Sequence, residues 1–352
     1  MPVTPAPSET ELAERLAARA LELVDIPSES RSEAELAAHV ASVLSAGGAV
    51  VEDLGDSCVL AHPREMTPRV LLAGHLDTVP AQGNLPGRMD GGRVYGLGAS
   101  DMKGALAVMA ELVLARAPYA ALFFPREELP STESALTPLL ERSALDFDFV
   151  VVMEPTDGEL HAGCLGNINA TWTFSGRSGH SARPWHADNA IHRAAEGIAA
   201  LAGVEPHPVS FAELTFTEVA SVTKIEGGIA TNVIPDVCRA HVNFRYAPGR
   251  SPSDAEARLR ELTGGHGSLE IRGNSASAPV ALEHPLARKL IDAGGLEVAP
   301  KQAWTPVAEF AAAGYAAVNF GPGATAQAHQ REEHVEIAAL LAAHRVLEAF
   351  GT

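Results

Sequence analysis

The chain of 352 residues carries 26 Lys and Arg against 44 Asp and Glu, a formal net charge of −18, and 46% of its residues are apolar. This length and composition allow one large domain or two smaller ones with an ample core. The acidic balance disfavours binding to nucleic acid or to an anionic membrane, and no apolar run approaches the roughly 20 residues that cross a bilayer. Since the N-terminus also lacks the pattern of a secretory signal, we expect a cytoplasmic protein.

The first half of the chain alternates helical patterns with short apolar runs. Ser8 with Glu11, and Ser32 with Glu35, have the spacing of a capping box ahead of a helix. A helical pattern over 102–116 lies between two of the apolar runs, which are found at 57–61, 69–75, 120–124 and 149–154. This alternation predicts an α/β fold with a mixed, mostly parallel central sheet that is flanked by helices.

Segments that alternate polar and apolar residues replace the apolar runs after Gly163. They lie at 167–176 and 239–248, and alternation of this kind is typical of half-buried antiparallel strands. Helical patterns near 189–201 and 253–262 accompany them. The sequence therefore predicts a smaller α+β module at this point of the chain.

The α/β pattern returns near the C-terminus, with a helix, a strand and a final helix predicted at 284–294, 316–321 and 336–350. We therefore expect a catalytic domain made of residues 1–164 and 277–352. The α+β module, at 165–276, would be inserted into it. The three cysteines are far apart and form neither a disulfide framework nor a metal-binding knuckle.

Candidate chemical groups follow several of the predicted strands. His75 and Asp77 end one apolar run, and their spacing of two places both on one face. Asp101 follows a glycine-rich turn and begins a helical pattern. Each has an ordinary alternative, because a His-x-Asp pair can be structural and Asp is a favoured N-cap residue.

Further carboxylates and a histidine occupy corresponding places. Glu127 and Glu128 follow one apolar run, Glu154 ends another, and His329 lies in a loop beyond the strand near 317–320. In open α/β sheets such strand ends build the functional site. Imidazoles and carboxylates without cysteine suit Zn²⁺, Co²⁺ or Mn²⁺, and a bridging carboxylate would allow two ions. A further carboxylate would have to take a proton from the attacking water.

Taken together, these segments resemble the M20 family of metallopeptidases and deacylases. The resemblance covers nearly the whole chain and rests on stretches such as "VLLAGHLDTVPAQGNLP", "GASDMKG", "EPTDGELHAGCLG", "GHSARPWHADNAIH" and "AHQREEHV". It implies a metal-binding catalytic domain, an inserted lid domain that pairs two copies into a homodimer, and two divalent metal ions. Zinc is the favoured metal, with cobalt or manganese as alternatives.

The resemblance also implies roles residue by residue. Asp101 would bridge two metals, and the ligand sets would be His75, Asp101 and Glu154 for one ion and Asp101, Glu128 and His329 for the other. Glu127 would be the general base, and Asp77 would orient His75. His180 would reach the site of the partner subunit and stabilise the oxyanion.

Substrate recognition follows from the same resemblance. Arg245 would bind a carboxylate of the N-acyl amino acid, with Asn232 as the polar partner nearby and Arg183 as a further candidate. The stretches "NLP", "GHSARPW" and "NFRYAPGRS" favour the desuccinylase branch of the family, which hydrolyses N-succinyl-LL-2,6-diaminopimelate in lysine biosynthesis. A deacetylase acting on N-acetylornithine or N-acetyl-lysine, or a dipeptidase, would share every metal residue.

Some positions depart from the family pattern. Arg126 precedes the glutamate pair where a small or acidic residue is usual, and we expect it to point away toward another carboxylate. Pro306 and Glu309 replace a usual Asp and Arg, and Leu97 replaces an Arg or Cys. The changes to Pro306 and Glu309 favour an altered substrate pocket. No expected metal ligand is lost.

Overall fold

The computed structural model describes residues 8–143 and 145–352, and the chain divides into two compact units. Unit 1 runs to Gly163 and resumes at 281–299 and 305–352, and unit 2 comprises 164–280 with 300–304. Unit 2 contains the whole of the predicted inserted domain, 165–276, and also residues 164, 277–280 and 300–304, which were predicted to belong to the catalytic domain. No helix in the described part of the chain is long and apolar enough to cross a membrane.

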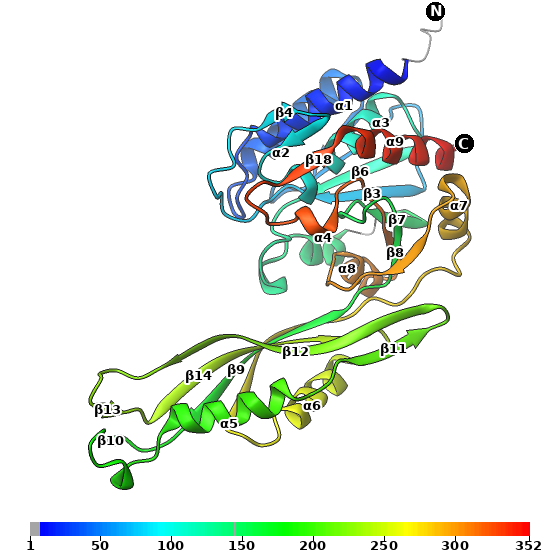
Figure 1. Ribbon diagram of the computed structural model, residues 1–352. Coiled ribbons are helices and arrows are strands. Elements are labelled where there is room, and N and C mark those ends of the chain that lie inside the picture. Colours follow the sequence, from blue (N-terminus) through cyan, green and yellow to red (C-terminus); the bar gives the residue numbers. More distant parts are fainter. Residues whose placement is uncertain (1–7, 144) are drawn as a thin grey trace, which may run out of the picture. The chain divides into compact units, whose positions relative to one another are not determined.

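Unit 1 is built on an eight-stranded mixed sheet (Figure 1). In spatial order its strands are β1 (Val50–Asp53), β2 (Val59–His62), β6 (Tyr119–Phe124), β3 (Val70–His75), β7 (Phe149–Val152), β17 (Ala316–Asn319), β8 (Leu160–Ala162) and β16 (Val298–Pro300). The central strands β6, β3, β7 and β17 are parallel, whereas β2 and β8 run antiparallel to their neighbours. The prediction of a mixed, mostly parallel sheet at the centre of an α/β fold is confirmed.

Helices cover both faces of this sheet. On one face α1 (Glu9–Val24), α3 (Gly104–Leu114) and α9 (Ile337–Gly351) pack together, and on the other lie α4 (Leu136–Arg142) and α8 (Val307–Ala312) (Figure 1). Every residue of β6 and β7 is buried, which explains why these strands are continuous apolar runs in the sequence. The remaining elements of unit 1 are α2 (Ala34–Ala46), α7 (Pro285–Gly294) and a small antiparallel sheet of β4 (Arg88–Asp90), β5 (Arg93–Tyr95) and β18 (His334–Glu336).

The two predicted capping boxes have different outcomes. In the first, Ser8 Oγ accepts the Glu11 N–H and the Glu11 carboxylate accepts the Ser8 N–H, so this prediction is confirmed. The second is wrong, because α2 begins at Ala34 and its N-cap residue, Glu33, makes no side-chain cap bond. The buried Glu33 carboxylate instead accepts the N–H of Arg31 at 2.8 Å, so a bond outside the helix fixes this turn.

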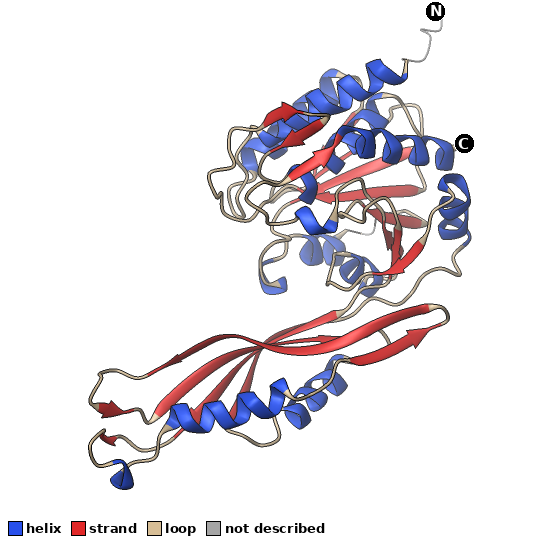
Figure 2. Ribbon diagram, in the orientation of Figure 1, coloured by secondary structure: helices blue, strands red, loops and turns tan. Residues whose placement is uncertain are grey.

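Unit 2 is a five-stranded antiparallel sheet with helices on one face (Figure 2). Its strands, in spatial order, are β11 (His207–Phe211), β12 (Leu214–Gly227), β14 (Val237–Tyr246), β9 (Gly166–Ser175) and β15 (Ser268–Ser275), and its helices are α5 (Ala190–Ala202) and α6 (Pro252–Leu262). Buried side chains of β9 and β14 alternate with half-buried ones, as the polar–apolar alternation predicts. A short pair, β10 (Gly179–His180) and β13 (Val233–Ile234), lies in the loops at one end.

Candidate metal centre

The carboxyl ends of the four central parallel strands deliver the candidate ligands. His75 is the last residue of β3, and the chain leaving β6 carries Glu127 and Glu128. Glu154 follows β7, and His329 lies in the loop that follows β17. Because parallel strands end at one edge of their sheet, residues that are far apart in the sequence meet there.

Asp101 joins this group from the connection between β3 and β6. It lies in a π-helical turn, Ala99–Lys103, that precedes α3. The N-cap residue of α3 is Lys103, which makes no side-chain cap bond. The alternative interpretation of Asp101 as an ordinary helix cap therefore does not hold.

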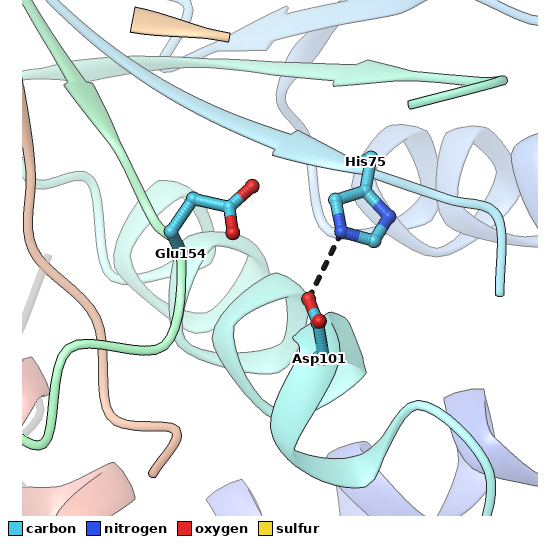
Figure 3. Close-up of side chains that lie close together, drawn as sticks. All are labelled: His75, Asp101 and Glu154. Carbon is cyan, nitrogen blue, oxygen red and sulfur yellow. Dashed lines mark hydrogen bonds and ion pairs between the residues drawn. The ribbon is translucent and has the colours of Figure 1, made fainter. Parts of the chain in front are cut away.

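The first ligand set is compact. His75 Nε2 lies 3.1 Å from Asp101 Oδ1, and one ligand atom each from His75, Asp101 and Glu154 lies within 4.8 Å of the others. The three side chains converge from the end of β3, from the turn before α3 and from the segment after β7 (Figure 3). His75 and Glu154 are buried, and only Asp101 is partly exposed.

A second set shares Asp101 with the first. His329 Nε2 lies 2.9 Å from Glu128 Oε1 and 3.6 Å from Asp101 Oδ2, and the three ligand atoms again fall within 4.8 Å of one another. The hydrogen bond to Glu128 raises the pKa of His329 to about 9, although partial burial opposes it. The two oxygens of Asp101 thus face the two histidines separately, as a bridging carboxylate requires.

Glu127 lies beside both sets without completing either of them. Its side chain is densely surrounded by protein atoms although part of it reaches the surface. Burial, followed by the charge of Glu154, raises the pKa of Glu127 well above its usual range. Glu127 also forms a third close group, with His75 and Glu128. A carboxylate in this position is near enough to exchange a proton with a water held at the centre.

The donor set suits two divalent cations. Four carboxylates and two imidazoles make up the three close groups, and no cysteine takes part. When ionised, the carboxylates carry about four negative charges, which two divalent ions would balance. Oxygen and imidazole nitrogen are the ligands of paired zinc, cobalt or manganese sites.

Asp77 holds the loop that carries the glutamate pair. Its carboxylate accepts the N–H groups of Glu127 at 2.9 Å and Glu128 at 3.0 Å, and also the hydroxyl of Ser30 at 2.8 Å. The sequence assigned this residue to the orientation of His75. The close contact to the Nδ1 atom of His75 comes from the backbone carbonyl of Asp77, at 2.9 Å, whereas its carboxylate is 3.7 Å away.

The unusual Arg126 points away from the glutamate pair, as predicted. Its guanidinium forms a two-pronged pair with the carboxylate of Asp56, and its Nε donates to the carbonyl oxygen of Glu133 at 2.7 Å. This pair lowers the pKa of Asp56. The guanidinium of Arg126 is thus engaged by Asp56 and by the backbone of Glu133 rather than by Glu127.

Of the other three departures, Glu309 and Pro306 lie at α8. Glu309 of α8 accepts the hydroxyls of Ser134 at 2.6 Å and of Thr137, and its burial raises its pKa. Its carboxylate thereby joins α8 to the segment around α4. Pro306 is the N-cap residue of α8, and Leu97 is buried in the core.

The candidate substrate residues lie in unit 2. His180, Arg183 and Asn232 occupy the paired loops at β10 and β13, where Ser181 N–H donates to the carbonyl of Asn232 at 3.0 Å. Arg245 lies on β14, and its Nε donates to Asn243 Oδ1 at 2.9 Å. Burial lowers the pKa of Arg245, and within the described residues no carboxylate pairs with it.

Asn243 is a residue that sequence reasoning missed. Its Nδ2 donates to the side chains of Asn167 at 2.7 Å and Asn169 at 2.9 Å on β9, and its own oxygen accepts from Arg245. The sequence shows polar residues at alternating positions of both strands. Only the register of β9 and β14 shows that the three asparagines are neighbours.

Comparison with known proteins decides the family. Residues 71–351 match the model of peptidase family M20/M25/M40. The chain belongs to this family. Membership makes it a metal-dependent amidohydrolase, and the predicted family, fold and enzyme class are confirmed.

Curated relatives of similar length are known. A Mycobacterium tuberculosis protein, provisionally named succinyl-diaminopimelate desuccinylase DapE, is 37% identical over 93% of this chain and 95% of its own length. The succinyl-diaminopimelate desuccinylase of Corynebacterium glutamicum is 34% identical over 90% of each chain. The N-acetyl-L-citrulline deacetylase of Xanthomonas campestris is 32% identical over 82% of this chain and 83% of its own.

Solved protein structures share this fold. The aminopeptidase PepT of Bacillus cereus superposes with a TM-score of 0.76 over 96% of this chain and 97% of its own, at 19% identity. The YXEP protein of Bacillus subtilis, described as a dinuclear metal-binding peptidase of the M20 family, gives a TM-score of 0.66 at 16% identity over 97% and 98% of the two chains. At these identities the likeness concerns the fold alone.

Proposed function

We propose that the chain is a dinuclear-metal desuccinylase that hydrolyses N-succinyl-LL-2,6-diaminopimelate to succinate and LL-diaminopimelate in lysine biosynthesis. The observation that carries the proposal is the pair of ligand sets that share Asp101, with Glu127 beside them. The curated desuccinylase relatives, which match along almost the whole chain, support the choice of substrate. A biosynthetic role of this kind agrees with the cytoplasmic location that the sequence predicts.

Each side chain of the centre receives a defined task. We propose that His75, Asp101 and Glu154 hold one ion and that Asp101, Glu128 and His329 hold the other, with zinc favoured and cobalt or manganese as alternatives. When bound, two such ions polarise the scissile carbonyl and make the attacking water more acidic. Asp77 keeps the glutamate pair in place through their backbone N–H groups.

Glu127 is proposed as the proton carrier. Because it completes neither of the two ligand sets, its carboxylate is available to accept the proton of the attacking water. It can then donate this proton to the leaving amine, which departs as the amide bond breaks. General acid–base steps of this kind contribute about 10²–10⁴-fold to the rate.

Unit 2 would supply substrate recognition. We propose that Arg245 binds a carboxylate of the substrate, because it is half-buried and its one recorded side-chain hydrogen bond goes to a neutral asparagine. Asn232 and Arg183 are proposed as further polar contacts. His180 is proposed to stabilise the oxyanion in the site of a partner subunit, in a homodimer formed through unit 2.

A second candidate is a deacylase with another acyl-amino acid substrate, such as N-acetylornithine or N-acetyl-lysine, or a dipeptidase. Glu309 and Pro306 favour it, because neither supplies a cation or a free carboxylate for a succinyl or diaminopimelate group. Glu309 is committed to the hydroxyls of Ser134 and Thr137. The deacetylase relative of Xanthomonas campestris also supports it.

The deciding experiment compares initial rates on N-succinyl-LL-diaminopimelate, N-acetylornithine and N-acetyl-lysine, with Zn²⁺ or Co²⁺ added. We expect the highest kcat/KM on the succinyl substrate. The Glu127→Gln protein, assayed in parallel, reports any contaminating hydrolase. A clear preference for an acetyl substrate would overturn the desuccinylase assignment and leave the metal chemistry intact.

A further inference from the structure

One buried carboxylate beside the centre has no assigned role. Glu333 lies four residues after His329, and it is 2% exposed. Its Oε1 accepts the N–H groups of Ser100 and Asp101, and its Oε2 accepts the N–H of Gly98, each at 2.9 Å. Three N–H groups of the turn that carries Asp101 therefore donate hydrogen bonds to one side chain.

The backbone of Glu333 adds to this connection. Its carbonyl oxygen accepts the N–H of Gly96 at 3.0 Å, and its own N–H donates to Gln330 in the loop of His329 at 3.2 Å. Ser100 contributes a parallel contact, because its hydroxyl donates to the carbonyl of Ala324 at 3.0 Å. The turn before α3 and the loop after β17 are thus joined through Glu333 at several points.

The hydrogen bonds of the turn itself run from the N–H groups of Lys103 and Gly104 to the carbonyls of Gly98 and Ala99, so they leave the N–H groups of Gly98, Ser100 and Asp101 to other partners. Asp101 and the residue after it have non-helical φ/ψ values, and Gly98 has a φ of +77°. A Cβ at Gly98 would also lie 2.7 Å from Thr78, so this position admits only glycine. A backbone of this shape needs outside partners for its N–H groups, and the carboxylate of Glu333 supplies them.

We propose that Glu333 is a positioning residue, which fixes Asp101 between His75 and His329 before either metal ion binds. A bridging ligand must present one oxygen to each ion, so a shift of its backbone would disturb both ligand sets together. Asp77 plays a comparable part for Glu127 and Glu128, whose N–H groups it accepts. Glu333 and Asp77 are buried carboxylates outside the two ligand sets. Between them they hold the backbone of Asp101 and of the glutamate pair.

This inference rests on the proposed metal centre, and its test begins with metal affinity. Metal-free Glu333→Gln protein is titrated with Zn²⁺ and Co²⁺ in competition with a chelator. The substitution keeps the size of the side chain but exchanges one acceptor oxygen for a donor that faces backbone N–H groups. We expect about 10–100-fold weaker binding, the range found when partners of ligands are removed, together with a changed cobalt absorption spectrum.

The matched control is Glu332→Gln. Glu332 is the neighbouring residue with the same side chain, but it is exposed and contacts Arg88 at 3.2 Å. This variant should bind metal as the wild type does. If Glu333→Gln also binds metal within threefold of the wild type, the proposal is overturned, even when its thermal stability falls. If the wild type itself binds no metal, the proposed function fails instead.

Hydrogen exchange on the metal-free wild type tests the proposal without a substitution. We expect slow exchange for the N–H groups of Gly98, Ser100 and Asp101, because Glu333 holds them in the absence of metal. Rapid exchange of all three would overturn the proposal. Should Glu333→Gln fail to fold, Glu333→Asp keeps the charge with a shorter reach, and we expect it to lose affinity by a smaller factor.

Discussion

The two units of the molecule place their chemistry in different ways. In unit 1, four parallel strands end at one edge of the sheet, and each strand or the loop after it delivers at least one polar side chain to the same place. In unit 2, the sheet is antiparallel, one face is covered by α5 and α6, and the polar side chains spread along the strands and end loops. A parallel sheet concentrates distant residues, whereas an antiparallel sheet presents a surface.

This difference predicts that bound metal ions stabilise unit 1 and leave the stability of unit 2 unchanged. Removal of the ions with a chelator should abolish activity, because the centre would lose the groups that polarise the substrate. At a thousandfold excess of metal over its Kd, each bound ion stabilises the folded state by about 4 kcal/mol. Thermal unfolding and hydrogen exchange with and without chelator measure the effect.

We expect the loss of exchange protection to be confined to the loops around Asp101 and Glu128. The strands β9 and β14 serve as the internal control, since no residue of either strand belongs to a ligand set. Added Zn²⁺ or Co²⁺ should restore activity. A comparable loss of protection in β9 and β14 would break the distinction between the units.

A buried carboxylate of unit 2 tests the comparison from the other side, because its loss should lower stability without changing metal content. Glu218 is 4% exposed, and its carboxylate accepts two bonds of 2.8 Å from Arg250 and one of 3.0 Å from the N–H of Ala247. Glu218→Gln should lower the free energy of unfolding by about 2–3 kcal/mol, because Arg250 would lose a buried partner. Urea unfolding measures this, and metal content measured on the same samples should not change.

Arg245 is expected to affect substrate binding alone. Arg245→Ala should lower kcat/KM by about 30-fold, since a hydrogen bond to a charged group contributes about 2 kcal/mol. Metal content should stay at the level of the wild type. Arg272→Ala is the matched control, because Arg272 lies on β15 of the same sheet and already pairs with Glu270. Equal effects of the two substitutions would contradict the proposal that Arg245 contacts the substrate.

The smallest effect concerns the pair of Arg126 and Asp56. Arg126 lowers the pKa of Asp56, so the folded state gains stability above the unfolded pKa of Asp, about 3.9, and loses it as the pH falls through the folded value. Because Asp56 is half exposed, we expect less than about 1 kcal/mol. Asp56→Asn should therefore lower the Tm at pH 7, and the difference should shrink as the pH falls below the unfolded pKa of Asp. A difference that does not shrink on acidification would contradict this account.

The sequence was most informative where the pattern was local. The apolar runs predicted β2, β3, β6 and β7, and the alternation after Gly163 predicted β9 and β14, because burial on two faces or on one face leaves a direct trace in the residue order. Short edge strands such as β1 and β4 were missed, since their residues are half-buried or exposed. Each pairs with the strand that follows it in the chain, β1 with β2 and β4 with β5.

The site was predictable to a similar extent. Most of the ligand residues could be named because they lie at or after the end of a strand, whereas Asp101 was named from its glycine-rich turn, and the family motifs fixed the role of each. Glu333 could not, since it differs from the neighbouring Glu332 only in its surroundings: one is buried beneath the turn of Asp101, and the other is exposed. The second capping box failed for the same kind of reason, because the Glu33 carboxylate bonds to Arg31 and no side chain caps α2.

The central claim is that neighbouring glutamates divide the work, with Glu128 holding metal and Glu127 moving a proton. The most direct measurement is the metal content and the turnover of Glu127→Gln, determined on one sample. We predict two divalent ions per chain, as in the wild type, with kcat reduced by about 10²–10⁴-fold. Full turnover with both ions bound, or the loss of the ions themselves, would contradict this division.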